Sequence, residues 1–326
     1  MTTDHEPLTT GYCRGLHGWA VLTVCAALPL VLLGAEVTTR QVGMADEVGF
    51  RTPWHLATLH LEGVLQDKGL GFLIEHSHRL AGFVVGSCAI VLAAWAWRAP
   101  NRRVRWLGVA ALAGVSLQGL LGGFRVNLHQ LLGPDLALLH GCFGQVVFAL
   151  LVSVALLTSR GWSEDAECGP EDRGRARRAA WFALLVTGLV LGQLVFGAIL
   201  RHKGSPLGQR LHLTMAFGVV AAAVWLLRLV ADGADRRLSG AVQLLLLFVA
   251  AQVLLGVEAW MIRFAGLGLT LPEEVLWRRD LVRSAHVLMG ALILATSVVA
   301  TLEAFRRAAP AAGTVRASVG RLEGAA

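Results

Sequence analysis

Charged residues are scarce in this sequence. Only 16% of its 326 residues are charged, whereas 55% are hydrophobic. Apolar runs of 18 or more residues are long enough to cross a bilayer, and the backbone must pair its own polar groups there, which favours helices. The chain contains eight such runs, at residues 16–35, 72–97, 104–124, 136–158, 179–200, 211–231, 239–262 and 284–304. The composition therefore predicts an all-α integral membrane protein with eight transmembrane helices in a lipid bilayer.

Cysteine is absent from two of the predicted outer loops, residues 36–71 and 201–210. An oxidising compartment would pair cysteines placed there. The five cysteines of the chain lie elsewhere, at Cys13, Cys25, Cys88, Cys142 and Cys168. We expect them to be packing residues or cytoplasmic thiols.

Negative charge is in deficit, and the net charge of +7 could indicate a nucleic-acid partner. The arginines, however, follow the even-numbered spans, in residues 98–105, 160–178, 228–237 and 306–321. Cytoplasmic loops of membrane proteins carry such an excess of Arg and Lys. The charge pattern therefore predicts that both termini are cytoplasmic, and it gives no reason to expect nucleic-acid binding.

The spans repeat between the two halves of the chain. The third and seventh contain Q-x-L-L-G, at residues 118–122 and 252–256, and the first and fifth contain LLGA (32–35) and VFGA (195–198). Each odd-numbered span then runs to an arginine: Arg40, Arg125, Arg201 and Arg263. Four spans separate the matching segments, so both halves have the same orientation. This predicts two pseudo-symmetric four-helix bundles related as a parallel repeat.

Each even-numbered span begins with a histidine that is followed four residues later by Gly or Ala. The pairs are His78/Gly82, His140/Gly144, His212/Ala216 and His286/Gly290. Residues i and i+4 share one helix face, so each pair places a ligand nitrogen beside a flat patch of backbone. That shape suits a planar macrocycle. Imidazole is a usual axial ligand of haem iron, and helix bundles commonly hold cofactors in their cores.

Within each half the two histidine-bearing helices run in the same direction, so their imidazoles lie at one depth. The pattern predicts two bis-histidine haem sites near the outer surface, one at His78 and His140 and one at His212 and His286. A zinc site is less favoured because zinc needs three or four converging ligands. Candidates for pairing haem propionates are Arg40, Arg79, Arg125, Arg201 and Arg263, with interfacial anchoring as the alternative.

Glu75 lies three residues before His78, on the same helix face and one turn nearer the surface. The corresponding positions before the other three histidines hold Ala137, Gln209 and Arg283. An ionisable group in a membrane is costly, which makes it a functional candidate. Beside a haem it could move protons or stabilise a cation, although the helix dipole alone would also favour it. The asymmetry predicts chemistry in the first half and electron transfer in the second.

Six segments together resemble haem A synthases of the bacterial and mitochondrial type, over about residues 16–304. They are IEHSHRLAGFVVG, LQGLLGGFRV, LALLHGCFGQ, FGAILRH, RLHLTMA and RSAHVLMG. The resemblance implies that the ring methyl of haem O is oxidised to a formyl group, which gives haem A for terminal oxidases. It also implies a bacterial plasma membrane or mitochondrial inner membrane location. Haem O synthase, a quinone or other electron acceptor, and the terminal oxidase assembly machinery are the implied partners.

The resemblance also implies a role for each of five residues. His78 and His140 would hold the substrate haem, Glu75 would be the catalytic carboxylate, and His212 and His286 would hold haem b. Two histidine ligands leave no open position on the iron. Either one ligand swings away or oxidation occurs at the ring edge. Many members of the family carry outer-loop cysteine pairs, which residues 36–71 and 201–210 lack.

Two other functions remain open. A non-catalytic dihaem b cytochrome would need the histidines but has no evident use for Glu75 on one side only. A transporter or haem-handling protein without redox chemistry is less favoured, because transporter helices tend to be interrupted by Gly or Pro. Only Pro29 falls inside a predicted span.

The predicted domain organisation has four parts. Residues 1–160 form the substrate-haem bundle, 161–178 a cytoplasmic linker, 179–305 the haem b bundle and 306–326 a disordered tail. A short amphipathic helix within residues 52–69 is expected to lie at the interface, where it could form a lid over the first site.

Overall fold

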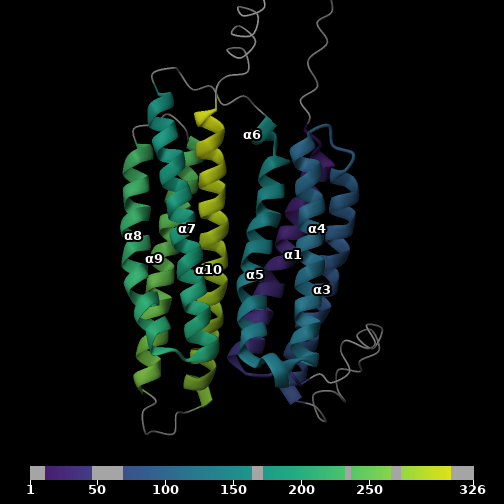
Figure 1. Cartoon of the computed structure of the whole chain (residues 1–326), viewed down its shortest axis with the longest axis vertical. Coiled ribbons are helices and arrows are strands. Elements are labelled where there is room, and N and C mark those ends of the chain that lie inside the picture. The colour runs from purple at the N-terminus through teal and green to yellow at the C-terminus, as the bar shows by residue number, and fades with distance from the viewer. Residues whose placement is uncertain (1–11, 46–68, 164–171, 232–235, 266–272, 310–326) are drawn as a thin grey trace, which may run out of the picture. The chain divides into compact units, whose positions relative to one another are not determined.

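The computed structural model describes residues 12–45, 69–163, 172–231, 236–265 and 273–309 (Figure 1). Its elements are helices throughout the described residues. They are α1 (Arg14–Thr39), α3 (Gly69–Ala96), α4 (Arg102–Asn127), α5 (His129–Leu157), α6 (Arg160–Ser163), α7 (Arg173–Lys203), α8 (Pro206–Ala231), α9 (Arg236–Ala265) and α10 (Glu273–Ala308).

All eight predicted spans are confirmed as helices long and apolar enough to cross a membrane. Each of them extends beyond the apolar run, because polar residues such as Arg102 and Arg173 also adopt helical geometry at the ends. Large apolar side chains stay exposed along the spans, as Phe217 at 79% and Leu254 at 71% show. In water such faces would be unfavourable, whereas in a bilayer they contact lipid. The protein is an integral membrane protein.

The helices group into two compact units. The first contains residues 1–164 and 252–291, and the second contains residues 165–251 and 292–326. The predicted division into two pseudo-symmetric bundles, with boundaries at residues 160 and 179, stays a prediction. The linker residues 164–171, the tail beyond residue 309 and most of the predicted lid helix lie outside the described residues.

In the first unit, α1 and α4 both pack against α3 and α5, so these four helices close a ring. Small residues bring the helices together: Ala20, Ala89 and Ala96 are fully buried. An added Cβ on Gly108 of α4 would stand 2.6 Å from Ala96 of α3. Close backbone approach of this kind is how membrane helices gain packing energy without a hydrophobic driving force.

The helix α5 is kinked near its start. Gly133 has φ +36° and ψ −119°, and Pro134 follows it inside the helix. A non-glycine residue rarely adopts a positive φ, and proline cannot donate a backbone hydrogen bond. The membrane span of α5 begins at Leu131, earlier than the apolar run predicts, and so contains Pro134. Two spans, those of α1 with Pro29 and α5 with Pro134, thus have a proline inside them.

In the second unit, α7 packs against α8. The connection is short, because Gly204 ends α7 in the left-handed conformation at φ +60° and α8 begins at Pro206. The Ser205 hydroxyl accepts a hydrogen bond from the Gly208 backbone at 3.1 Å and so caps α8. This turn fixes the start of the helix that carries His212.

Candidate functional site

The His78 and His140 side chains lie together in the first unit. They come from α3 and α5, and their ring centroids are 6.5 Å apart with the ring planes at 80°. The two residues are far apart in the sequence, and they meet because α1, α3, α4 and α5 close a ring. The predicted pair is therefore in contact.

Each of the four predicted ligand histidines lies against a glycine of the preceding odd-numbered span. A Cβ added to the glycine would stand 2.8–3.2 Å from the histidine Cε1. The pairs are Gly34 with His78, Gly122 with His140, Gly197 with His212, and Gly256 with His286. Only a residue without a side chain leaves room for the ring at this distance. These glycines form a ring seat for each histidine.

A hydrogen-bonding group lies four residues before each ring-seat glycine. His78 Nδ1 donates to the Leu30 carbonyl at 3.1 Å, and His212 Nδ1 donates to the Gln193 carbonyl at 3.1 Å. A metal-ligating histidine usually donates its other ring nitrogen to such an acceptor, which fixes the tautomer. With the proton on Nδ1, Nε2 is the ring nitrogen that carries the lone pair in each of these two histidines.

The other two histidines contact glutamine side chains instead. Gln118 Nε2 lies 3.2 Å from His140 Nδ1, and Gln252 Nε2 lies 3.2 Å from His286 Nε2. In the sequence, Gln118 and Gln252 stand out only as the first residues of the repeated Q-x-L-L-G motif. The signal for their role is present in the sequence, since each stands four residues before a ring-seat glycine.

The small residues four positions after the histidines differ in what they contact. An added Cβ on Gly144 would stand 2.9 Å from Gln118 Nε2, so Gly144 makes room for that amide. At Gly82 the nearest atom to an added Cβ is Leu30 Cδ1, at an ordinary 3.8 Å. Backbone remains open beside His78, whereas beside His140 it is covered by Gln118.

Glu75 is buried beside His78, with 3% of its surface exposed. Arg79, one turn further along α3, donates to the Glu75 carboxylate at 2.6 Å. Arg79 and Arg125 both interact electrostatically with His78, and Arg125 also interacts with Glu75. Burial of a carboxylate is tolerated when it is paired and hydrogen-bonded. The first site therefore joins one carboxylate and two guanidinium groups to the histidine pair.

The described contact of His76 is with an aromatic side chain of its own helix. Its ring stacks on Phe72, with centroids 5.4 Å apart and planes at 19°. His76 and His78 are about 200° apart around the helix, which places the two rings on different faces.

The other three arginine candidates have different surroundings. Arg40 donates to Glu36 at 2.8 Å, lies 3.7 Å from Asp280 and stacks over Trp277 at 4.2 Å. Arg201 lies in the last turn of α7. Arg263 belongs to α9, and its side chain lies outside the described part of the structure. The role of all five arginines in propionate binding stays a prediction.

The His78 and His140 pair fits a single iron held from two sides. With metal–nitrogen bonds of about 2 Å, two opposed imidazoles have ring centroids about 6 Å apart, and the observed value is 6.5 Å. Among the described residues no three His, Cys, Asp or Glu side chains come together as a metal site. Two imidazoles are the donor set of many haem sites, and ligation by this pair stays a prediction.

His212 belongs to the second unit and His286 to the first. Each has the same ring seat as the first pair. Their joint ligation of one iron stays a prediction from the sequence.

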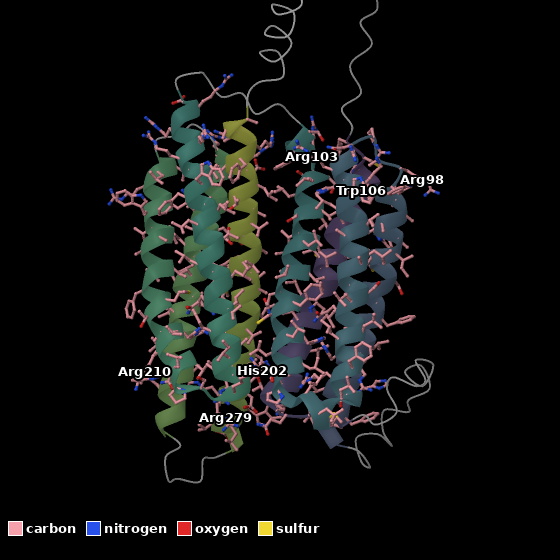
Figure 2. All side chains as sticks on the ribbon, viewed as in Figure 1. Arg98, Arg103, Trp106, His202, Arg210 and Arg279 are labelled. Carbon is pink, nitrogen blue, oxygen red and sulfur yellow. The ribbon has the colours of Figure 1, made fainter. Side chains whose placement is uncertain are left out.

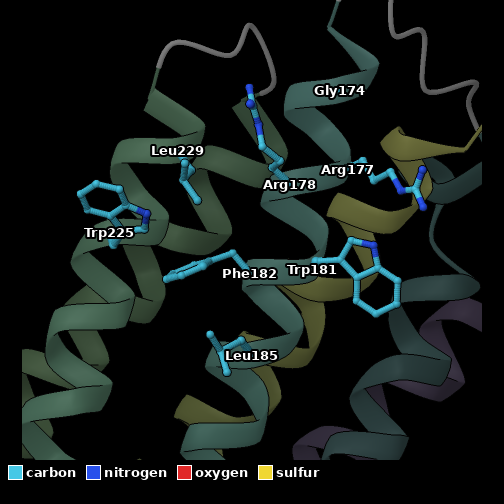
Figure 3. A pocket seen from close by; sticks show the side chains of 8 residues that line it. All are labelled: Gly174, Arg177, Arg178, Trp181, Phe182, Leu185, Trp225 and Leu229. Atoms are coloured by element: carbon cyan, nitrogen blue, oxygen red, sulfur yellow. The ribbon is translucent and has the colours of Figure 1, made fainter.

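A separate groove of about 640 Å³ lies on α7 and α8 of the second unit (Figure 3). Arg177 and Trp181 extend to one side of α7, whereas Phe182 extends to the other side, toward α8. Arg and Trp are enriched at membrane–water interfaces. The groove contains none of the predicted ligands.

The charged ends of the spans are visible in each unit. In the first unit Arg98, Arg103 and Trp106 lie at one end of the helices and Arg279 at the other, and in the second unit His202 and Arg210 lie at one end (Figure 2). The aromatic rings of Trp97 and Trp106 meet edge to face at 5.9 Å. Basic and aromatic residues at span ends are typical of membrane proteins.

The fold and the site define a polytopic membrane protein with a histidine pair beside a buried carboxylate. A family described as cytochrome oxidase assembly protein matches residues 54–207. The chain is 27% identical to the haem A synthase of Alkalihalophilus pseudofirmus over 60% of this chain and 62% of that protein. It is 29% identical to that of Lysinibacillus sphaericus over 60% of both chains, and 33% identical to that of Shouchella clausii over 44% of this chain and 45% of that protein.

The predicted resemblance to haem A synthases is confirmed by these matches. The chain spans about three fifths of the length of the relatives with the longest alignments.

Proposed function

We propose that this protein is a haem A synthase, an enzyme that oxidises the ring methyl of haem O to the formyl group of haem A. The observation that carries the proposal is the pair of His78 and His140 beside the buried, Arg79-bound carboxylate of Glu75 in the first unit. The relatives named as haem A synthases support it.

In this proposal His78 and His140 hold haem O as substrate. The Leu30 carbonyl orients the His78 ring by accepting from Nδ1, and the backbone of Gly34 lets the ring approach. Held in this way, the substrate would lie near Glu75, which is three residues from His78 on the same helix face. Orientation of this kind lowers the entropy cost of bringing reacting groups together.

Glu75 is the catalytic carboxylate of the proposal. As an ionised group it accepts a proton and stabilises positive charge that develops nearby. The Arg79 guanidinium holds the carboxylate in place through the 2.6 Å hydrogen bond. Arg79 and Arg125 are also the two propionate candidates that interact electrostatically with His78. Burial of Glu75 shields its carboxylate from water, which strengthens its ion pair with Arg79.

The second half holds haem b as an electron carrier, with His212 and His286 as its ligands. His212 fits this role because its Nδ1 donates to the Gln193 carbonyl, as one ring nitrogen of a metal-ligating histidine usually does. Haem b supplies one-electron transfer when it is bound. A quinone or another acceptor takes the electrons onward, haem O synthase supplies the substrate, and the terminal oxidase assembly machinery takes the product. We place the protein in a bacterial plasma membrane, or its mitochondrial equivalent, with both termini cytoplasmic.

To test the proposal, the protein is expressed in cells that make haem O but have no haem A synthase of their own, and the haems are then extracted and separated. We expect haem A in cells that express the wild-type protein. Glu75→Ala should abolish haem A while haem b is retained, because the substitution removes the carboxylate and leaves all four histidines. Haem b alone in cells expressing the wild type would contradict the proposal and favour a dihaem b electron-transfer cytochrome.

A further inference from the structure

The groove on α7 and α8 combines an apolar lining with a basic end (Figure 3). The apolar part is made of aromatic and leucine side chains, namely Trp181, Phe182, Leu185, Trp225 and Leu229. Arg177 and Arg178 line the groove near the start of α7. A ligand that matches both parts has an anionic end and a long apolar body.

The two arginines have no anionic partner within the part of the chain that the structure describes. Neither the Arg177 nor the Arg178 guanidinium forms a hydrogen bond or an ion pair there, and both side chains are exposed. Arg306 of the same unit, in contrast, is paired with Glu303 at 3.3 Å. Guanidinium groups bind phosphate and carboxylate groups through two parallel hydrogen bonds. The groove therefore offers two cations to an anion from outside the protein.

The backbone at the same end also favours an anion. Gly174 lies in the first turn of α7, one turn before Arg178, and a Cβ added to it would meet no atom within 4 Å. The N–H groups of a first helical turn have no acceptor within the helix and attract anions. Asp172 at the N-cap makes no side-chain hydrogen bond to them. An anionic headgroup thus finds open space beside Gly174.

The apolar lining of the groove faces lipid. Trp181, Leu185 and Trp225 are each more than half exposed, which in a membrane helix means contact with the bilayer. Tryptophan and arginine are also the residues that membrane proteins place at the level of the lipid headgroups. A lipid molecule can therefore enter the groove sideways from the bilayer.

The groove is separate from the proposed haem sites. Trp225 follows His212 by 13 residues on α8, which corresponds to a rise of about 20 Å along the helix. A haem ligated by His212 therefore does not occupy the groove.

The acidic segment 164–171 is a rival partner for the two arginines, because it lies close to them in the sequence. Its residues are Glu164, Asp165, Ala166, Glu167, Cys168, Gly169, Pro170 and Glu171. None of them has a large apolar side chain that would cover Phe182, Leu185 and Leu229. The apolar lining therefore favours a lipid over this segment.

We propose that the groove binds an anionic phospholipid, with the headgroup at Arg177 and Arg178 and an acyl chain along Phe182, Leu185 and Leu229. This site does not depend on the proposed haem chemistry. The charge pattern predicts that this end of α7 is cytoplasmic, and basic pockets between membrane helices on that side suit anionic headgroups.

The test measures lipid binding to the purified full-length protein in detergent by native mass spectrometry. Wild type should bind phosphatidylglycerol more tightly than phosphatidylcholine, and inorganic phosphate should not displace it, because phosphate lacks the apolar body. Arg177→Gln with Arg178→Gln should weaken phosphatidylglycerol binding by about 30-fold, since each arginine near an anionic headgroup contributes about 1 kcal/mol. Exposed substitutions of this kind leave folding nearly unchanged.

Arg103→Gln with Arg175→Gln is the matched control. It removes the same charge from exposed residues at span ends, and neither residue lines the groove. This double variant should bind phosphatidylglycerol as wild type does. Equal losses in both double variants, or equal wild-type affinity for the two lipids, would overturn the proposal.

A third variant tests the rival partner. It carries Gln or Asn in place of the four acidic residues of segment 164–171 and should also bind phosphatidylglycerol as wild type does. Binding that appears only in this variant would show that the acidic segment occupies the arginines, and the lipid site would be wrong.

Discussion

At the scale of single residues, the site depends on where side chains are missing. The ring-seat glycines let four imidazoles lie directly on the backbone of a neighbouring helix: an added methyl group would clash at Gly34 and Gly197 and would make an unusually tight contact at Gly122 and Gly256. Hydrogen-bond partners four residues earlier then orient the rings. On each odd-numbered span, the ring-seat glycine and the hydrogen-bonding residue four positions before it thus orient the histidine ring of the next span.

Gly34→Ala tests the ring seat of the first site. The new Cβ would stand 2.8 Å from His78 Cε1, so the ring must shift and its bond to Leu30 must lengthen. Overpacking of this kind costs about 1–3 kcal/mol, and each 1.4 kcal/mol corresponds to about tenfold in affinity. Titration with iron protoporphyrin IX should show the loss, together with an altered low-spin spectrum.

The control for that substitution is Gly18→Ala on the same helix. An added Cβ on Gly18 meets nothing within 4 Å, so porphyrin affinity should be unchanged. A Gly34→Ala protein with wild-type affinity would show that the ring is not seated on that backbone during binding.

At the scale of the helices, interhelical hydrogen bonds add to small-residue packing. The hydroxyls of Thr187 on α7 and Thr301 on α10 are 2.9 Å apart in the second unit. In the first unit, Thr39 on α1 and Ser284 on α10 are 3.2 Å apart. Such bonds between membrane helices contribute about 0.6 kcal/mol on average.

Thr187→Val should therefore destabilise the protein by about 0.6 kcal/mol, because it removes the bond to Thr301 but keeps the side-chain volume. Thr296→Val is the control, since the Thr296 hydroxyl donates only to the Leu292 carbonyl of its own helix. Unfolding in detergent by a denaturant would compare the two variants. Equal stability of Thr187→Val and the wild type would show that the interhelical bond contributes nothing.

At the scale of the whole molecule, the distribution of arginines predicts the orientation in the membrane. Arg102, Arg103 and Arg105 surround the connection between α3 and α4, whereas the connection between α7 and α8 is the short turn at Gly204. The positive-inside rule assigns the first connection to the cytoplasm, and the topology then assigns the second to the opposite side.

A short epitope inserted after Asn101 should therefore be inaccessible to antibody in intact spheroplasts, and the same epitope after Gly204 should be accessible. Permeabilised spheroplasts, in which both epitopes should bind antibody, are the control. The reverse pattern would invert the topology and move the histidine pairs to the cytoplasmic side.

The sequence by itself determined the eight membrane helices and the histidine at the start of each even-numbered span. Helix formation in a bilayer is a local property, since every backbone hydrogen bond forms within one segment. The length of an apolar run can be counted directly in the sequence. The repeated motifs also carried the resemblance to haem A synthases that the matched relatives confirm.

Only the tertiary structure decided what surrounds each histidine. The contacts of His78 with Gly34 and of His140 with Gln118 join different helices, and no periodicity within one helix shows them. The kink at Gly133 and the pairing of Arg40 with Glu36 and Asp280 likewise depend on packing. Side chains from neighbouring helices meet only after the bundle closes, which is why the ligand positions follow from the sequence while their tautomers and partners do not.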